Sequence, residues 1–167
     1  MEQLLKIIVL GFLALVVLSV LGVFAFVSVV TPTRVTVVSA PPPANAATHD
    51  GLWAQASNLH QDSGGAHSGP PAGQKYIVVH IVLTNQGTHA VSYSALNFQL
   101  EHAADHVRHD ADAFDTNISP TALTSGSIEA NERIAGDIAF QVPARENGFR
   151  LLWTPDILND SIPVPLT

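Results

Sequence analysis

The chain has 167 residues, 47% of them hydrophobic, and its seven Lys and Arg against fourteen Asp and Glu give a formal net charge of −7 at pH 7. This acidic balance argues against nucleic acid or an anionic lipid surface as the partner, because both bind through clustered Lys and Arg. The chain has no cysteine and its one methionine is the first residue, which excludes disulfides, thiolate metal sites and thioether copper sites.

Residues 7–30 form an uncharged apolar run whose only polar members are Ser19 and Ser28. A helix of this length crosses a hydrocarbon core of roughly 30 Å. A cleaved signal peptide is the alternative, but its apolar region is only about 7–15 residues long. We therefore expect a cytoplasmic stub at 1–6 and one transmembrane helix at 7–30 in contact with the lipid bilayer. The predicted location is a bacterial or archaeal cytoplasmic membrane, with the following domain on the periplasmic or extracellular side.

The segment 31–50 is rich in Pro, Ala, Thr and Val, and contains three consecutive prolines at 41–43. Consecutive prolines favour an extended, semi-rigid polyproline II conformation of about 3.1 Å per residue. We expect this segment to be a stalk that holds a domain away from the bilayer.

The segment 51–158 is a succession of short runs with strand character, separated by turn residues. The strongest run is 75–85, which is dense in β-branched residues and places Ile77, Val79, Ile81 and Leu83 on one face. A loop rich in Gly and Pro at 62–73 precedes it. The other predicted strands are 51–60, 91–93, 96–100, 106–109, 134–142 and 149–153. Short strands at this spacing, with no convincing amphipathic helix, predict an all-β antiparallel sandwich.

Three motifs in this region add a resemblance. Gly73–Gly87 forms the first, Ser94–Leu100 fits a pattern with Phe98 and Leu100 two residues apart, and Gly136–Pro143 reads G-x-I-x-F-x-V-P. Together they resemble a bacterial and archaeal family of secreted Ig-like domains of unknown function, related to a secreted immunogenic antigen. Members are commonly tethered as lipoproteins or by one helix. The resemblance covers 73–153 and implies an Ig-like sandwich without shared catalytic residues. It departs at Asn131, where a turn glycine is usual, although Asn also adopts the left-handed conformation.

The densest polar segment is 101–112. Imidazole and carboxylate ligands suit zinc, nickel or Cu(II), so the candidate metal ligands are His102, His106, His109, Asp110 and Asp112. No H-E-x-x-H motif accompanies them, and the aspartates lack the turn glycine and closing glutamate of a calcium loop. The alternative is an exposed hairpin with surface histidines.

Signatures of catalysis are missing from the sequence. It has no nucleophile elbow of the form G-x-S-x-G and no phosphate-binding loop. We expect a protein that is not an enzyme and needs no cofactor. His80 is expected on the strand face opposite Ile77, at the surface or in an interface, and Trp53 in the core, at a sheet edge or, if exposed, as a recognition anchor.

The segment 159–167 alternates Pro with aliphatic residues. Its prolines exclude a central strand, yet a free tail would not need Ile162, Val164 and Leu166. We expect this tail to dock in extended form, either along the sandwich's own edge or on a neighbouring subunit. A frayed terminus is the alternative.

These features predict a non-catalytic binding or scaffolding module, anchored in the membrane and presented outside it. It acts either alone on a soluble ligand or as an accessory subunit of a larger membrane complex (respiratory, photosynthetic or transport), with Trp53 and the tail as candidate contacts to other membrane-protein subunits. The alternative function is a periplasmic metal-binding or metal-delivery protein that uses the segment 102–112.

Overall fold

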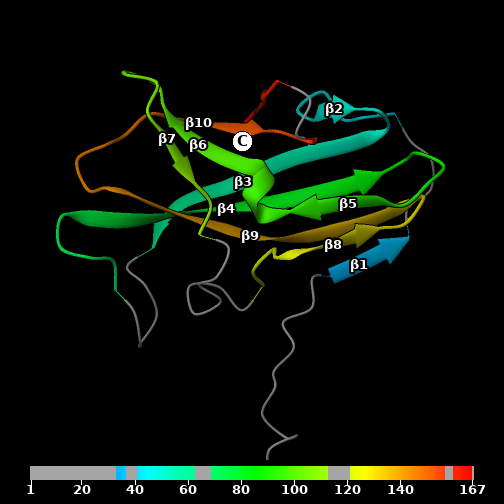
Figure 1. Cartoon of the computed structure of the whole chain (residues 1–167), viewed down its shortest axis with the longest axis horizontal. Helices are drawn as coiled ribbons and strands as arrows, with labels where there is room; N and C mark the ends of the chain where they lie inside the picture. The colour runs from blue at the N-terminus through cyan, green and yellow to red at the C-terminus, as the bar shows by residue number, and fades with distance from the viewer. Residues whose placement is uncertain (1–32, 37–40, 63–68, 113–120, 157–159, 167) are drawn as a thin grey trace, which may run out of the picture.

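The computed structural model describes residues 33–36, 41–62, 69–112, 121–156 and 160–166. Apart from one short 3-10 turn, the elements of these residues are β-strands (Figure 1). Their bounds are β1 Thr33–Thr36, β2 Ala47–His49, β3 Leu52–Asp62, β4 Gln74–Asn85, β5 Val91–Ser94, the 3-10 turn Ala95–Asn97, β6 Phe98–His102, β7 Arg108–Asp110, β8 Ser125–Ile128, β9 Glu132–Pro143, β10 Phe149–Trp153 and β11 Ile162–Val164.

The first layer is a five-stranded sheet in the order β1-β9-β4-β3-β2, with antiparallel neighbours. Its centre is the pair β4–β9, which runs in register from Gln74 opposite Pro143 to Asn85 opposite Glu132. The predicted inward face of β4 is confirmed, since Ile77, Val79, Ile81 and Leu83 are all buried in the main core. Its β-branched residues suit a strand covered on both faces.

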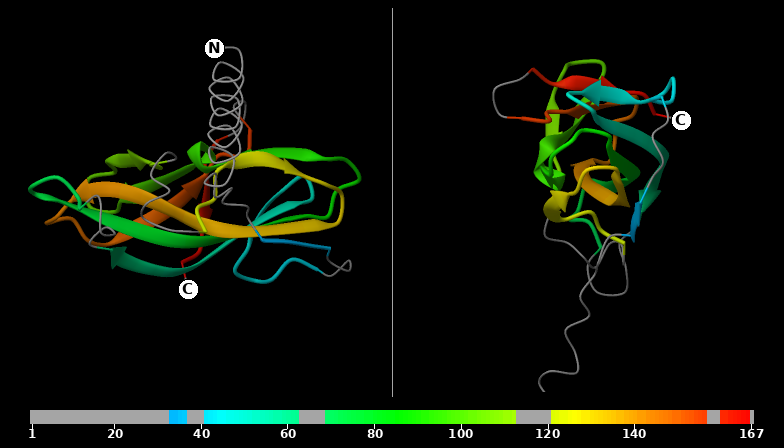
Figure 2. Two further views of the ribbon diagram at one scale, coloured as in Figure 1. Left: turned by 90° about the horizontal axis from the view of Figure 1, so that it is seen from below. Right: turned by 90° about the vertical axis from the view of Figure 1, so that its right-hand side faces the viewer.

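The second layer consists of a four-stranded sheet, in the order β11-β10-β6-β7, and the two-stranded sheet β5-β8. The two layers face each other across one core, and the end-on view in Figure 2 shows this sandwich. Phe98 and Trp153 stack in that core with their ring centroids 6.3 Å apart. The predicted antiparallel sandwich is therefore what the described residues form.

Two parts of the predicted stalk are strands of the sandwich instead. β1 pairs with β9 at the edge of the first sheet, and β2 pairs with β3 at the opposite edge. Arg34 at the centre of β1 also forms an ion pair of 3.0 Å with Glu132 of β9. The prolines at 41–43 favour an extended stalk, but the β-branched residues on either side of them pair with edges of the sheet, which a local pattern does not show. Residues 37–40 lie outside the described part of the chain.

The predicted stub at 1–6 and transmembrane helix at 7–30 also lie outside the described residues. Within the described ranges, no helix has the length and apolar character needed to cross a membrane.

The C-terminal tail docks along the sandwich's own edge. β11 pairs antiparallel with β10, so that Leu151 lies opposite Val164 and Trp153 lies opposite Ile162. β11 is the edge strand of its sheet, as Pro163 requires, because proline cannot donate to a second ladder. Beyond β11, Leu166 forms an isolated parallel bridge with Ala56 of β3. The tail thus closes part of the seam between the two layers.

Candidate functional site

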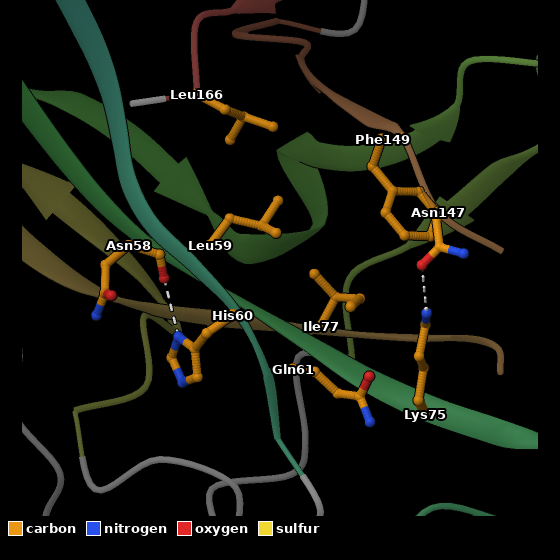
Figure 3. A pocket seen from close by; sticks show the side chains of 10 residues that line it. Asn58, Leu59, His60, Gln61, Lys75, Ile77, Asn147, Phe149 and Leu166 are labelled. Carbon is orange, nitrogen blue, oxygen red and sulfur yellow. Dashed lines mark hydrogen bonds between the residues drawn. The ribbon is translucent and has the colours of Figure 1, made fainter. Parts of the chain in front are cut away.

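The seam between the layers is open beside Leu166, the last described residue of the tail. A cavity of about 570 Å³ lies there, between the second half of β3 and the start of β10 (Figure 3). Its lining residues are Asn58, Leu59, His60, Gln61, Lys75, Ile77, Asn147, Gly148, Phe149 and Leu166. We call this cavity the open seam. A second hollow of about 280 Å³ shares Phe149 and Leu166 with it and continues along β10 and the tail.

A β-bulge in β3 shapes one wall of the open seam. The register between β3 and β4 shifts between Ser57 and His60, where the intervening Asn58 has a φ of 53°. Asn tolerates this left-handed conformation better than most residues. A bulge adds a residue and re-aims the side chains around it. Leu59 consequently keeps 38% of its surface exposed, although it is a large apolar residue.

Lys75 gives the open seam a buried cation. Alternate residues of a strand point to one face, so Lys75 points to the same inner face of β4 as the core residues Ile77 and Val79. Only 6% of Lys75 is exposed. Its ammonium donates to the carbonyl oxygen of Glu146 at 2.6 Å and to Oδ1 of Asn147 at 3.3 Å. Both acceptors are uncharged, and no carboxylate of the described residues forms an ion pair with Lys75.

The loop that receives Lys75 needs a glycine at its end. Gly148 has a φ of 73°, a conformation that L side chains rarely adopt, and it leads directly into β10. The next residue, Phe149, lines both hollows. The glycine turn therefore aims an aromatic ring into the open seam.

The candidate metal ligands His102 and His109 lie on the inner face of the second sheet, and the rings of both contact that of Phe149. The ring centroids of the two histidines lie 6.0 Å and 6.4 Å from that of Phe149. Each has its own carboxylate: His102 Nδ1 lies 2.7 Å from Asp105, and His109 Nε2 lies 2.8 Å from Glu146. The two imidazoles therefore have different carboxylate partners.

The other three candidates lie elsewhere. His106 contacts Glu101 and Arg150, Asp110 accepts from Gln99 at 2.7 Å, and Asp112 lies just beyond β7 with its backbone N–H bonded to Ala139. Successive strand residues point to opposite faces, which separates His109 from Asp110. Among the described residues, no group of three His, Asp or Glu side chains is placed to hold a metal ion.

The outer face of the second sheet carries a charged cluster around Glu101. The Glu101 side chain is only 7% exposed, and it contacts His106, Arg108 and Arg150. The hydrogen bond from His106 lowers the pKa of Glu101 most, and that from Arg150 lowers it further against an opposing effect of burial. A hydrogen bond from His102 likewise lowers the pKa of Asp105.

These shifts predict a loss of stability in acid. A carboxyl whose folded-state pKa is lowered stabilises the fold fully above its unfolded value, here an ordinary 4.5 for Glu101 and 3.8 for Asp105. That stabilisation is lost as the pH falls through the folded-state pKa. We expect the urea concentration at the unfolding midpoint to decrease as the pH falls below about 4.5. In Glu101→Gln this midpoint should depend less on pH. The control Glu129→Gln, at an exposed position, should keep the wild-type pH dependence; equal flattening by both would contradict the assignment.

The candidate partner contacts are placed as follows. Trp53 keeps only 9% of its surface exposed, so little of its ring is available as an anchor. Val164 belongs to the main core, and Ile162 and Leu166 pack against it. The tail's apolar residues therefore serve the chain's own fold, because the outward positions between them hold Pro163 and Pro165. Leu166 also lines the open seam.

Lys75, Leu59 and Phe149 are site residues that the sequence analysis did not single out. A usable signal existed for Lys75, since the alternation of 75–83 puts a charged residue at an inward position. No such signal existed for Leu59, because a bulge reverses the strand's alternation and depends on pairing with β4.

A family model matches the chain over residues 43–162, and its description is "Domain of unknown function (DUF4352)". A comparison with curated protein sequences found no match. The matched family has no established function, as the sequence resemblance implied.

Solved structures of several bacterial proteins are similar to this chain. The ycdA "putative lipoprotein" of Bacillus subtilis is 16% identical with a TM-score of 0.57, covering 74% of this chain and 37% of its own. A conserved hypothetical protein of Bacillus anthracis is 11% identical with a TM-score of 0.52, covering 83% of this chain and 100% of its own. The secreted protein MPT63 of Mycobacterium tuberculosis is 13% identical with a TM-score of 0.49, covering 81% of this chain and 89% of its own. This chain thus spans little more than a third of the ycdA protein, and likenesses at these identities concern the fold alone.

Proposed function

The chain belongs to the DUF4352 family, and from that premise we propose that it is a non-catalytic binding module of Ig-like type that works outside the cytoplasm. The observation that carries this proposal is the open seam. This cavity combines apolar side chains with the buried ammonium of Lys75, which forms no ion pair with a carboxylate of the described residues. Concave apolar sites with a few placed polar groups are the usual form of a binding site.

The location outside the cytoplasm rests on two supports. The uncharged run at 7–30 is long enough to anchor the chain in a bilayer. The structural neighbour of Bacillus subtilis is described as a "putative lipoprotein", a class held on the outer side of the cytoplasmic membrane. We propose that the run at 7–30 is a single membrane anchor, with the N-terminus in the cytoplasm and the sandwich outside. On this basis the module serves as an accessory subunit of a larger membrane complex.

The proposal of a non-catalytic role is supported by the hydrogen bonds within one cluster of polar side chains. A hydroxyl, a carboxylate and an imidazole do meet on the outer face of the first sheet. There Thr121 Oγ1 donates to Asp137 Oδ2 at 2.7 Å, while His80 Nδ1 contacts Oδ1 of the same carboxylate at 2.7 Å. The hydroxyl donates to the carboxylate and not to the imidazole, so His80 is not placed to activate it as a nucleophile.

One experiment tests both location and partnership. The chain has no cysteine, so Ala104→Cys at the exposed tip of the β6–β7 turn provides a unique thiol. We expect a membrane-impermeant fluorescent maleimide to label this variant in intact cells, as strongly as after permeabilisation. In mild detergent the labelled protein should then elute from gel filtration with a larger complex. Labelling only after permeabilisation would refute the location, and elution as a lone small protein would refute the accessory role.

A further inference from the structure

The open seam has an apolar side and a polar side. In Figure 3, Leu166 and Phe149 lie on one side of the cavity, and Lys75 and Gln61 lie on the other. Leu59, which is 38% exposed, adds a further apolar wall. An occupant that fills this cavity therefore needs an apolar part and a polar group.

The polar group that suits the cavity is a negatively charged acceptor. The ammonium of Lys75 has three N–H donors. The carbonyl oxygen of Glu146 and Oδ1 of Asn147 accept two of them, and within the described ranges no further acceptor contacts Lys75. The carboxylate of Glu146 is bonded instead to Nε2 of His109 at 2.8 Å. One donor of a cation that is only 6% exposed thus remains for an anionic ligand.

A carboxylate fits the available donors better than a phosphate does. Gln61 lines the cavity on the same side as Lys75, and its side-chain amide forms no hydrogen bond with the part of the chain that the structure describes. One ammonium donor and one amide group can each serve one oxygen of a carboxylate. A phosphate, with a charge of about −2 and three acceptor oxygens, needs more donors than these two groups supply.

The carboxylate is expected on a side chain, because the cavity offers few partners to a peptide backbone. Buried N–H and C=O groups need hydrogen bonds, whereas Leu59, Ile77 and Phe149 present apolar side chains. The nearby carbonyl oxygen of Asn58 already contacts Nδ1 of His60 at 2.9 Å. An acidic side chain can enter alone, while the backbone that carries it stays in water.

We propose that the open seam binds an acidic side chain of a partner protein, flanked by apolar residues. The carboxylate pairs with Lys75, and the flanking apolar side chains contact Leu59, Phe149 and Leu166. This inference rests on the proposed binding function, for which it names the chemistry of the partner. The chain's net charge of −7 repels acidic segments in general, so recognition of one requires a local cation such as Lys75.

The test uses the full chain in a neutral detergent and one defined probe. The probe is a library of acetylated heptapeptides with Glu at the centre, flanks of Val, Leu, Phe, Ser or Thr, and a C-terminal carboxamide. Two matched libraries replace the central Glu by Gln, one with a carboxamide and one with a free terminal carboxylate. Affinity selection with mass spectrometry identifies the retained peptides, and fluorescence anisotropy then gives the Kd of each in all three forms.

We expect the wild-type chain to bind the Glu form at least about tenfold more tightly than the Gln carboxamide, because a charge-assisted hydrogen bond in a buried site is strong. The Gln form with a free terminal carboxylate should bind no more tightly than the Gln carboxamide. Lys75→Met should bring the Glu-to-Gln ratio to about one. Arg145→Gln removes an equal charge from an exposed position in the adjoining loop and should leave the ratio unchanged.

Retention of none of the three forms, equal affinity for the Glu form and the Gln carboxamide, tightest binding of the form with a free terminus, or a preference for Glu that survives in Lys75→Met would overturn the inference. The comparison of the peptide forms on the wild-type chain needs no variant, so it decides the matter even if Lys75→Met fails to fold. The proposed function fails separately: it is lost if Ala104→Cys is not labelled from outside, whereas this inference is lost by the peptide result alone.

Discussion

Replacement of Val164 by aspartate is expected to lower the free energy of unfolding by about 3 kcal/mol or more. Val164 is 3% exposed and lies opposite Leu151 inside the main core, where a carboxylate would lose its hydration. Such a loss is a large share of the roughly 5–15 kcal/mol that stabilises an ordinary domain. Urea unfolding of the full chain measures it, with tryptophan fluorescence as the signal, because Trp153 lies opposite Ile162 of the same tail strand.

The matched control introduces the same charge one residue further on. Pro165 is exposed, so Pro165→Asp leaves the core packing in place and removes only the stiffness of the proline. Its effect should be about 1 kcal/mol or less. Equal destabilisation by the two variants, or none by either, would mean that the tail does not form part of the sandwich.

The sequence predicts the strands whose pattern is local. The run 75–85 and the segments near 91–93, 134–142 and 149–153 alternate apolar and polar residues, and all are strands in the structure. The left-handed turn expected at Asn131 is also found, with a φ of 60°. These features depend on side chains and turn residues that act over a few neighbours, so a single sequence is enough to find them.

Strands that depend on distant partners have no local sequence pattern that predicts them. β8 has the sequence Ser-Gly-Ser-Ile, without apolar alternation, and it forms because it pairs with β5. A Cβ at Gly126 would lie 3.0 Å from the hydroxyl of Tyr93 on the paired strand, so glycine is there to fit a ring contributed by another element. β1 likewise exists only as the edge partner of β9.

The residues of the candidate sites also include some that the local sequence indicates and others that only the fold brings together. The histidines and aspartates of 102–112 are close in sequence, but strand alternation distributes them to separate partners. The open seam instead joins Leu59, Lys75 and Phe149 from three strands, and the bulge in β3 decides how it is shaped. The candidate ligands in 102–112 are close in sequence but do not form one site. The residues that line the open seam are far apart in sequence and meet only in the fold.

Photo-cross-linking at the open seam in living cells is the most direct test of whether the module binds a partner there. A photo-reactive benzoyl-phenylalanine placed at Leu59, which is 38% exposed and lines the cavity, samples whatever occupies it. The matched control places it at Leu96, which is 58% exposed and does not line the cavity.

Irradiation should yield a discrete adduct of higher mass with the Leu59 variant of the full chain and none with the Leu96 variant. Mass spectrometry of that adduct should place the cross-link in one segment of one partner. No adduct at Leu59, or adducts of equal yield at both positions, would contradict the claim that this module binds its partner through the open seam.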